Sequence, residues 1–410
     1  MEDVVCNGCS LLCDDVVVEV TDGEVHSLGL CRLGHQHLLS SIESNSPQAS
    51  TRESGKATEV SIDEALERAA ELLLSSERPI LYGWSGSTNE TITLGLELAK
   101  TLGGIIATPA NLGMTQALSH TLHSMDLGID LEYVRNNGEL IIYWGSDPTE
   151  SSHRHPSKFA VLPRGENIPE GIESRTIGVV DVRNTETMKM ANHRLIIPPG
   201  MDSAILEALV SEISGTSSIA SDVAGIGPQE LIGLARNIRK ADCTVIFYGS
   251  GIINSGNADA NLSSLQAFIE AVRGIGKQAF ALPMAPESNI MGAIKSLSTD
   301  ASTSSITDIV AGDFDAALVV GDDALVELPG SAAKALAQLP LVYIGPPGIT
   351  SGKARVSICI TDDVITGIGT MNRLDLVEIE FKQWNSQKEE RLAEHDVMAR
   401  LLELIRKEKS

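Results

Sequence analysis

The sequence predicts an α/β protein that joins a small N-terminal cap to two related parallel-sheet units. Short apolar runs alternate with helical stretches over most of the 410 residues, the pattern of strands and crossover helices in a sheet covered on both faces. Four of the six cysteines lie within the first 31 residues, which marks that segment as distinct. The expected regions are a cap over 1–48, α/β domains over 59–215 and 225–362, and a C-terminal strand and helix over 363–410.

The chain is acidic, with 31 Lys+Arg against 55 Asp+Glu and a formal net charge of -24. Such a charge repels nucleic-acid backbones and anionic membrane surfaces, so we expect no nucleic-acid partner. The N-terminus lacks the basic start and apolar run of a signal peptide, and no stretch approaches the ~18 apolar residues of a membrane span. We therefore expect a cytoplasmic protein without membrane association, in which cysteines bind metals more often than they form disulfides.

The cap contains Cys6, Cys9, Cys13 and Cys31, with a predicted strand at 16–20 before the fourth cysteine. Four thiolates are the ligands of a [4Fe-4S] cluster, one for each iron. Structural zinc also accepts four cysteines, but its usual signature has two Cys-x-x-Cys pairs, and this segment has one. The spacing favours an iron–sulfur cluster over zinc; a site that has lost its metal is the third interpretation.

A polar, serine-rich connector at 40–58 follows the cap, and a capping box at Ser61 and Glu64 then begins an amphipathic helix. Buried strands are predicted at 80–82, 140–143, 176–180, 195–197, 244–248, 316–320, 341–344 and 356–360. Cys243 and Cys359 sit in strand-like runs, where we expect them to be small buried hydrophobes.

The C-terminal region predicts a strand over 376–381 and a charged amphipathic helix over 387–407. The apolar stripe of this helix consists of Leu392, Val397, Leu401, Leu404 and Ile405. We interpret it as a helix that packs on the rest of the chain; a partner-docking arm is the alternative.

Three loops after predicted strands are candidate cofactor sites, because ligands of open α/β sheets bind beyond the carboxyl ends of strands. Their candidate residues are Gly83, Trp84 and Ser85, then Trp144, Gly145 and Asp147, then Asp181, Arg183 and Thr185. Ordinary strand-to-helix turns are the alternative for the first two loops. The third loop combines a carboxylate, a guanidinium and hydroxyls, which suits the sugar and guanine of a nucleotide.

His153 and His155 are candidate pocket residues rather than metal ligands, because Glu150 is the one carboxylate at ligand spacing and no thiol stands near. The loops also repeat between the two halves of the chain. The Tyr-Gly run at 82–83 corresponds to that at 248–249, and the loop at 144–147 corresponds to 321–323. This correspondence predicts two related α/β units.

These motifs together resemble the molybdopterin-dependent oxidoreductases, and within them the B-subunit family of formylmethanofuran dehydrogenase. The resemblance depends on Cys-x-x-Cys-x-x-x-Cys-Asp-Asp at 6–15, Tyr-Gly-Trp-Ser at 82–85, Trp-Gly-Ser-Asp-Pro at 144–148, His-Arg-His-Pro at 153–156, Leu-Pro-Arg-Gly at 162–165 and Asp-Val-Arg-Asn-Thr-Glu-Thr at 181–187. It covers nearly the whole chain, and it is strong to about residue 200 and thinner afterwards.

The resemblance implies a molybdopterin-oxidoreductase fold with a [4Fe-4S] cluster on Cys6, Cys9, Cys13 and Cys31. It also implies tungsten or molybdenum between two pterin guanine dinucleotides, which the three loops would hold. In the archaeal family the B subunit reduces carbon dioxide to formate, and an A subunit related to amidohydrolases condenses the formate with methanofuran. The C and D subunits are the other implied partners.

The chain differs from the family at the residues on which the family's redox chemistry depends. Counted back from Trp144, the metal-ligating cysteine or selenocysteine and the histidine after it fall on Gly113 and Met114. Glycine has no side chain to bind a metal, and methionine cannot transfer a proton. The family's Arg-Gly-His-Tyr-Asn motif is replaced at 284–289, and its Gly-Thr loop is only partly kept at 365–370. These losses argue against a bound tungsten or molybdenum bis-pterin cofactor.

Two functions therefore compete, and the sequence leaves open whether the chain is itself an enzyme. The first is a redox-inactive accessory component of a bacterial-type formyltransferase/hydrolase complex in one-carbon metabolism linked to tetrahydromethanopterin and methanofuran. The second is an active component that interconverts carbon dioxide and formate, with its metal held without a protein thiolate. The missing ligand at Gly113 favours the first.

Overall fold

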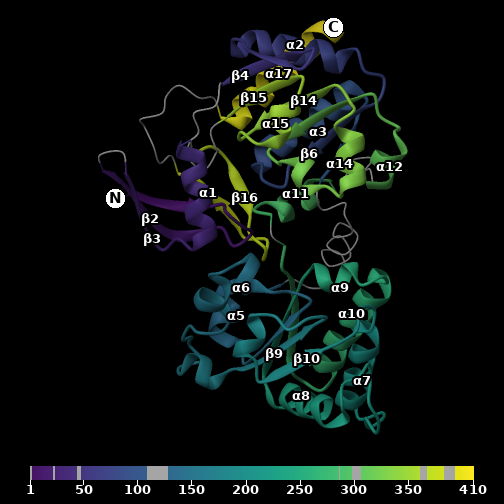
Figure 1. Cartoon of the computed structure of the whole chain (residues 1–410). Helices are drawn as coiled ribbons and strands as arrows, with labels where there is room; N and C mark the ends of the chain where they lie inside the picture. The colour runs from purple at the N-terminus through teal and green to yellow at the C-terminus, as the bar shows by residue number, and fades with distance from the viewer. Residues whose placement is uncertain are drawn as a thin grey trace. The chain divides into compact units, whose positions relative to one another are not determined.

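A computed structural model describes residues 2–21, 24–43, 48–108, 128–285, 287–297, 306–360, 367–382 and 393–410 of the chain (Figure 1). The chain forms two compact units. Unit 1 comprises Met1–Leu112, Glu287–Arg373 and Glu378–Ser410, and unit 2 comprises Gly113–Pro286 and Leu374–Val377.

These units differ from the consecutive domains that the sequence predicts over 59–215 and 225–362. The difference arises because strands from both halves of the chain pair within each sheet. In unit 1, Val320 pairs with Gly83, and in unit 2, Tyr248 pairs with Trp144. The corresponding loops of the two halves therefore lie in different units, and each unit contains one loop of each kind.

The cap in unit 1 is a three-stranded antiparallel sheet followed by a helix. Its elements are β1 (Glu2–Cys6), β2 (Cys13–Thr21), β3 (Glu24–Leu28) and α1 (Arg32–Glu43). The strand predicted at 16–20 is confirmed within β2. A two-stranded sheet of β16 (Thr370–Asn372) and β17 (Glu378–Glu380) provides Met371, and Phe381 follows it; both side chains pack with Leu12 of the cap.

The main sheet of unit 1 has the strand order β5-β4-β15-β14-β13-β6-β7. Five neighbouring strands run parallel, and β4 joins β15 antiparallel. The bounds are β4 (Ala49–Glu53), β5 (Lys56–Glu59), β6 (Pro79–Gly83), β7 (Ile105–Ala107), β13 (Ala316–Val320), β14 (Leu341–Gly345) and β15 (Val356–Cys359).

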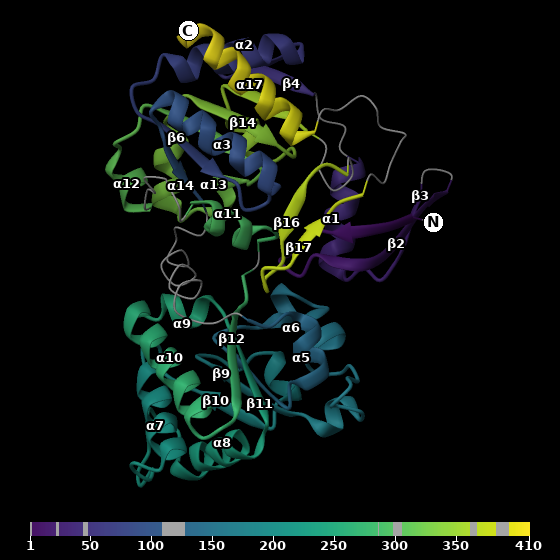
Figure 2. The same cartoon turned by 180° about the vertical axis from the view of Figure 1, so that it is seen from behind.

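Helices cover both faces of this sheet, because successive buried residues of its strands point to opposite sides. The face carrying Leu81 and Leu318 packs on α2 (Ile62–Leu74), α3 (Asn89–Leu102) and α17 (Glu394–Lys409), whereas Tyr82 and Val319 belong to the opposite face. The remaining helices are α11 (Ile290–Leu297), α12 (Ile306–Ala311), α13 (Ala324–Glu327), α14 (Gly330–Leu336) and α15 (Ile349–Lys353). Figure 2 shows α17 lying with α2 and α3 on one side.

The C-terminal helix is confirmed as a packing element, since Val397, Leu401 and Ile405 are buried against α2 and α3. Leu392 and the other residues at 383–392 lie outside the described residues. The predicted strand over 376–381 is shorter than expected and spans only β17.

Unit 2 has a five-stranded parallel sheet in the order β10-β9-β8-β11-β12. Its strands are β8 (Leu140–Trp144), β9 (Thr176–Asp181), β10 (His193–Ile196), β11 (Cys243–Tyr248) and β12 (Gln278–Pro283). Its helices are α5 (Leu131–Asn137), α6 (Pro148–Ser151), α7 (Asp202–Ser214), α8 (Pro228–Lys240), α9 (Ser250–Asn254) and α10 (Ala258–Gly274). Single turns occur at Pro156–Ala160, Gly171–Ser174 and Thr187–Met190.

The local sequence signals match the structure closely. The Ser61 side chain accepts a hydrogen bond from the Glu64 amide at 3.1 Å, which confirms the predicted cap as the start of α2. All eight predicted strands are present. Seven are buried, whereas β10 has exposed residues at Arg194 and Ile196. Cys243 and Cys359 are buried as expected. In the part of the chain that the structure describes, no helix is long and apolar enough to cross a membrane.

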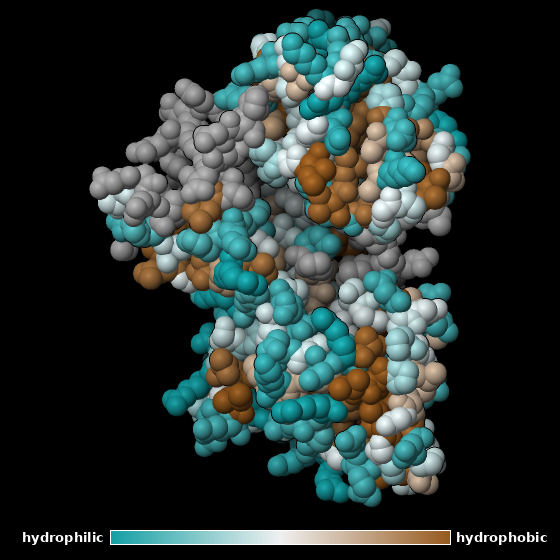
Figure 3. All heavy atoms as spheres, viewed as in Figure 1, coloured by the Kyte–Doolittle hydropathy of each residue, from teal (hydrophilic) through white to brown (hydrophobic). Residues whose placement is uncertain are grey.

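Apolar side chains gather in separate surface patches on both units, among mostly polar surface (Figure 3). The most exposed large apolar side chain among the described residues is Leu28 in the cap, at 65%.

Candidate functional site

Both parallel sheets have a topological switch point, where chain connections leave two adjacent strands in opposite directions. In unit 1 the chain passes from β6 outward to β7, and from β13 outward to β14 and β15. In unit 2 it passes from β8 to β9 and β10, and from β11 to β12. Ligands of open α/β sheets bind at such points, beyond the carboxyl ends of the strands. Two of the three predicted loops, at 83–85 and 144–147, follow these strands.

The switch loop of unit 1 begins with a glycine that the geometry requires. Gly83 has φ +120, and a Cβ there would collide with the carbonyl oxygen of Val320 on β13. The next residue, Trp84, is also at positive φ and is fully buried. Its indole Nε1 donates to the Leu81 carbonyl at 3.2 Å, and its ring packs on Gly95 of α3. Trp84 is therefore a core residue that shapes the loop.

Ser85 connects this loop to the end of β13. Its hydroxyl donates to both carboxylate oxygens of Asp322, at 2.9 and 3.1 Å, and its amide donates to Oδ2 at 3.4 Å. Burial raises the pKa of Asp322 well above its usual range, and the negative charges of Glu327 and Glu287 raise it further. The pKa values of Glu327 and Glu287 are also raised, chiefly by burial. Acidic side chains thus surround the unit 1 switch point, and the Ser85 donors are occupied by Asp322, whereas the buried Ser87 hydroxyl of the same loop has no partner among the described residues.

Asn289, whose role was not predicted from the sequence, also fixes the switch loop of unit 1 through hydrogen bonds to the loop's backbone carbonyls. Its amide donates to the Ser85 carbonyl, and its side-chain Nδ2 to the Ser87 carbonyl, both at 2.7 Å. Its Oδ1 accepts from the Asn372 amide at 2.8 Å. Asn289 ends the stretch over 284–289 that the sequence predicts in place of the family's Arg-Gly-His-Tyr-Asn motif, and here it is a structural residue of the loop.

The switch loop of unit 2 is closed by contact between backbones. The Gly251 amide donates to the Gly145 carbonyl at 3.0 Å, and a Cβ on Gly145 would lie 2.8 Å from the Gly251 Cα. The Gly249 amide donates to the Trp144 carbonyl at 2.9 Å. Trp144 is fully buried, and its indole donates to Asp202 Oδ1 at 2.8 Å. Both loop tryptophans consequently point into the core.

The second and third predicted loops meet at Asp147. Its Oδ1 accepts the hydroxyls of Thr149 at 2.6 Å and Thr187 at 2.5 Å, and its Oδ2 lies 4.0 Å from the Arg183 guanidinium. The Arg183 side chain is 68% exposed, so this ion pair is open to solvent. The structure therefore brings together residues that the sequence placed 40 positions apart.

Asp181 and Thr185 lie in the third loop. Burial raises the pKa of Asp181, although the Arg183 amide donates to its Oδ1 at 3.1 Å and opposes the shift. Thr185 is buried, and its hydroxyl has no hydrogen-bond partner among the described residues. A carboxylate and an unpaired hydroxyl are the groups expected for nucleotide binding, and here they lie in a single loop.

The histidine pair divides between two environments. His155 is fully buried, its Nδ1 is 3.0 Å from the Tyr143 hydroxyl, and its ring meets Phe247 edge to face. Burial lowers the pKa of His155 to about 3, so the ring is neutral near pH 7. His155 is a core residue here, whereas His153 is half-buried.

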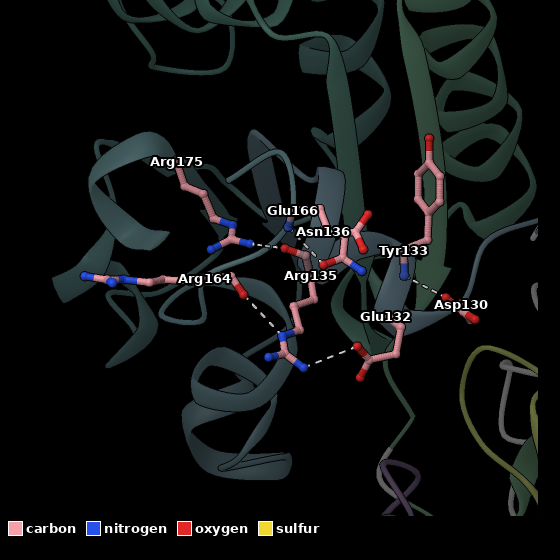
Figure 4. Close-up of polar contacts among 8 residues, drawn as sticks. All are labelled: Asp130, Glu132, Tyr133, Arg135, Asn136, Arg164, Glu166 and Arg175. Carbon is pink, nitrogen blue, oxygen red and sulfur yellow. Dashed lines mark hydrogen bonds and ion pairs between the residues drawn. The ribbon is translucent and has the colours of Figure 1, made fainter. Parts of the chain in front are cut away.

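The Leu-Pro-Arg-Gly loop at 162–165 is held by two arginines in unit 2 (Figure 4). The buried Arg175 guanidinium donates to the carbonyls of Gly138, Val161, Pro163 and Arg135. The Arg135 Nε donates to the Arg164 carbonyl at 3.3 Å. Arg175 and Arg135 thus order this surface loop by donating to its backbone carbonyls, and burial lowers the pKa of Arg175 to about 10.

The four cap cysteines lie near one another. Cys6 pairs with Cys13 across β1 and β2, and Cys31 precedes α1. Burial raises the Cys6 pKa to about 12, and the thiols of Cys13, Cys9 and Cys31 add to the rise. None of the six cysteines, all of which the structure describes, forms a disulfide.

Backbone amides point at two of these sulfurs. The Gly8 amide donates to Cys6 Sγ at 3.5 Å, and the Gly34 amide donates to Cys31 Sγ at 3.4 Å. A Cβ at Gly34 would lie 2.7 Å from Cys6 Sγ, so α1 approaches the thiols closely only because this residue is glycine. Amide hydrogen bonds to sulfur are a common feature around iron–sulfur ligands.

Among the described residues, no group of three or more His, Cys, Asp or Glu side chains is arranged to hold a metal ion. Gly113 and Met114, the predicted substitutes for the family's metal ligand and histidine, lie outside the described residues, as do Pro286 and the first two residues of the loop at 365–370.

Comparisons with known proteins agree with the predicted resemblance. No protein-family model matches the chain. The B subunit of tungsten-containing formylmethanofuran dehydrogenase 2 from Methanococcus maripaludis is 28% identical over 435 residues, covering 98% of each chain. The protein of the same name from Methanocaldococcus jannaschii is 26% identical over 435 residues, covering 99% of this chain and 98% of the relative. The similarity to the B subunit of formylmethanofuran dehydrogenase is therefore confirmed over nearly the full length.

Two solved structures share the fold. One is a chain of the formyltransferase/hydrolase complex (FhcABCD) from Methylorubrum extorquens in complex with methylofuran, with a TM-score of 0.68, 18% identity and coverage of 88% of this chain and 100% of that one. The other is acetylene hydratase from Pelobacter acetylenicus, with a TM-score of 0.75, 12% identity and coverage of 100% of this chain and 70% of that one. The expected α/β architecture with parallel sheets is confirmed.

Proposed function

We propose that the chain is the B subunit of a formyltransferase/hydrolase complex and that it has lost redox catalysis. Both curated relatives are named as B subunits of formylmethanofuran dehydrogenase, and a structural neighbour comes from the FhcABCD complex with methylofuran. The proposed partners are an amidohydrolase-like A subunit together with the C and D subunits. The complex would move formyl groups between tetrahydromethanopterin and methanofuran-type carriers and release formate.

The observation that carries the loss of redox catalysis is the sequence at Gly113 and Met114. Counted back from Trp144, these residues would stand at the positions of the family's metal-ligating cysteine or selenocysteine and its adjacent histidine. The sequence has no cysteine between Cys31 and Cys243 that could replace this ligand. Without a thiolate ligand and a proton donor beside it, the family's reduction of carbon dioxide lacks both protein groups on which it depends.

In the unit 1 switch loop, the Ser85 donors are not free to bind the pyrophosphate of a pterin dinucleotide. The Ser85 amide and hydroxyl, which could bind a phosphate, donate to Asp322 instead. A phosphate bound there would oppose ionisation of Asp322, Glu287 and Glu327, whose pKa values burial already raises. This supports the proposal that no bis-pterin cofactor binds.

For the cap we propose a [4Fe-4S] cluster as a structural group, on the strength of its four-cysteine motif and not of metal ligands already in place. The donor set is four neighbouring thiols, and amides of Gly8 and Gly34 point at two of them. Cys6, Cys9, Cys13 and Cys31 would ligate the cluster. It would replace two buried and two half-buried thiols by metal–sulfur bonds and would fix β1, β2 and α1 to one another. Its role in this proposal is stability of the cap.

A redox-active chain is the second candidate, and one observation favours it. Both curated relatives are named as tungsten-containing. In this alternative, tungsten or molybdenum would be held between two pterin dinucleotides without a protein thiolate, and the chain would interconvert carbon dioxide and formate.

Metal analysis of the complex purified with its native partners separates the two candidates. The accessory role predicts about four irons and four acid-labile sulfides per copy of the chain, with neither tungsten, molybdenum nor pterin. Stoichiometric tungsten or molybdenum would overturn the accessory role. Complete absence of iron would overturn the cluster assignment but leave the accessory role standing.

Cysteine variants assign the iron to the cap. Cys9→Ser is expected to lower the iron content and the yield of assembled complex, while formyl-group hydrolysis persists in the complex that still forms. Cys243→Ser is the matched control, because this thiol is buried in β11 of the other unit. Equal iron content in the Cys9→Ser and wild-type complexes would contradict the assignment.

A further inference from the structure

A pocket of about 640 Å³ opens at the amino-terminal edge of the unit 1 sheet, away from the switch loop at the carboxyl edge. It is formed where α2 crosses β4 and β15, which lie side by side (Figure 1). Asp315, Pro340 and Arg355, which directly precede β13, β14 and β15, line it. The volume lies in the range of small-molecule sites.

Two arginines face each other across the strands that form this pocket. The Arg52 amide donates to the Arg355 carbonyl at 2.8 Å, which continues the antiparallel register set by Thr51 and Val356. Like charges directly opposite on neighbouring strands destabilise a sheet. The chain has a net charge of -24, so carboxylates are abundant, and an arginine pair that none of them neutralises stands out.

Neither guanidinium is neutralised by a carboxylate. In the part of the chain that the structure describes, Arg355 has no side-chain hydrogen bond or ion pair, and Arg52 Nη1 donates only to the Gly55 carbonyl at 2.8 Å. Arg52 Nε is buried and has no hydrogen-bond partner among the described residues. A buried donor without a partner is costly, which indicates that an acceptor is missing.

The acidic residues of the pocket are mostly committed to other partners. Glu53 forms an ion pair with Arg68 at 3.0 Å. The Asp315 carboxylate accepts hydrogen bonds from the Ser76 hydroxyl and from the amides of Glu77 and Arg78, and these bonds lower its pKa. Glu71 is the remaining carboxylate of the lining.

We propose that this pocket binds a small molecule carrying two or more oxyanionic groups, phosphate or carboxylate, with Arg355 and Arg52 as its charged contacts. Guanidinium groups match the oxygens of phosphate and carboxylate in a bidentate geometry, and two of them side by side suit a dianion. The site lies on the sheet edge opposite the switch loop of unit 1 and does not depend on the proposed function.

Isothermal titration calorimetry of the full chain tests the proposal at about 0.15 M ionic strength, where nonspecific surface attraction is screened. The probes are pyrophosphate and glutarate, and saturable binding of at least one is expected. Arg355→Gln is expected to weaken that binding about tenfold or more. Arg355→Lys is expected to weaken it less, because lysine keeps the positive charge but cannot form the bidentate hydrogen bonds of a guanidinium group. Tighter binding of pyrophosphate would identify a phosphorylated ligand, and tighter binding of glutarate a carboxylate one.

Two further variants show whether the effect belongs to the pocket. Glu71→Gln is expected to strengthen binding a few-fold, since it removes the remaining acidic charge of the lining. Arg406→Gln is the control, because Arg406 pairs with Glu97 on α3 and does not line the pocket. Arg355 is exposed, so its variants should keep the melting temperature of the wild type. Absence of saturable binding by both probes, or equal losses in Arg355→Gln and Arg406→Gln, would overturn the proposal.

Discussion

The two switch loops occupy equivalent places in their sheets but differ in charge and in how they are closed. In unit 1 the loop after β6 is joined through Ser85 to the buried Asp322, with Glu287 and Glu327 adding negative charge. In unit 2 the loop after β8 is closed by glycine backbones, and its carboxylate, Asp147, is satisfied by two threonine hydroxyls with Arg183 beside it.

This difference shows that topology alone does not make a binding site. The same crossing of connections places a loop beyond the strand ends in both units. In unit 1 Asp322 accepts the amide and hydroxyl of Ser85, and the buried Ser87 hydroxyl of the same loop is unpaired among the described residues. In unit 2 an exposed guanidinium stands beside the loop, and the Thr185 hydroxyl is likewise unpaired among the described residues.

The largest expected effect comes from Gly83→Ala, which tests how tightly the unit 1 loop is closed. The new Cβ would meet the Val320 carbonyl oxygen at a φ that alanine avoids, so we expect a loss of about 4 kcal/mol in the stability of unit 1. Hydrogen exchange followed by mass spectrometry measures this, because peptides from β6 and β13 report on unit 1 separately from unit 2.

Gly103→Ala is the matched control. Gly103 also has a positive φ, +73, but nothing lies within 4 Å of the Cβ position, so the cost should be about 1 kcal/mol. Similar losses in both variants would mean that backbone conformation alone, and not contact with β13, makes glycine necessary at position 83.

The strands and loops that carry this contrast could be foreseen from the sequence, because their signals are local, but the contrast itself could not. The strands, the helix start at Ser61 and the positions of the loops follow from periodicity and turn residues within a few positions. The pairing of Ser85 with Asp322 could not be foreseen, because it depends on β13 joining β6 across 237 positions of chain. The same holds for the division into units and for the burial of Trp84, Trp144 and His155, which depends on what packs around each ring.

Asp322→Asn tests the acidity of the unit 1 loop through pH. The folded-state pKa of Asp322 is raised, so the folded chain holds this proton more tightly than the unfolded chain. Its contribution to stability is therefore fully present below the ordinary aspartate range and is lost as the pH rises through the folded-state pKa. The raised pKa values of Glu287 and Glu327, and the nearby Tyr82, act in the same direction.

We expect the stability of wild-type unit 1 to fall as the pH rises above the ordinary aspartate range. In Asp322→Asn, stability should fall less steeply with pH. Hydrogen exchange or thermal unfolding at a series of pH values measures both. Asp313→Asn is the control, because Asp313 is an exposed acid of the same unit. If the variant kept the full wild-type slope, the buried carboxyl at Asp322 would not be the source, and the electrostatic contrast between the two loops would fail.

The smallest effect on stability is expected for Arg183→Gln in unit 2. This variant tests whether Arg183 stabilises the loop or is available to bind a ligand. The side chain is 68% exposed and 4.0 Å from Asp147, so its ion pair should contribute less than about 0.5 kcal/mol. Thr187→Val is the comparison, because this buried hydroxyl donates to Asp147 and its loss should cost about 1–2 kcal/mol. Thermal unfolding of the two variants measures the difference. Equal destabilisation would make Arg183 part of the loop's framework, and unit 2 would then be as fully committed to its own contacts as unit 1.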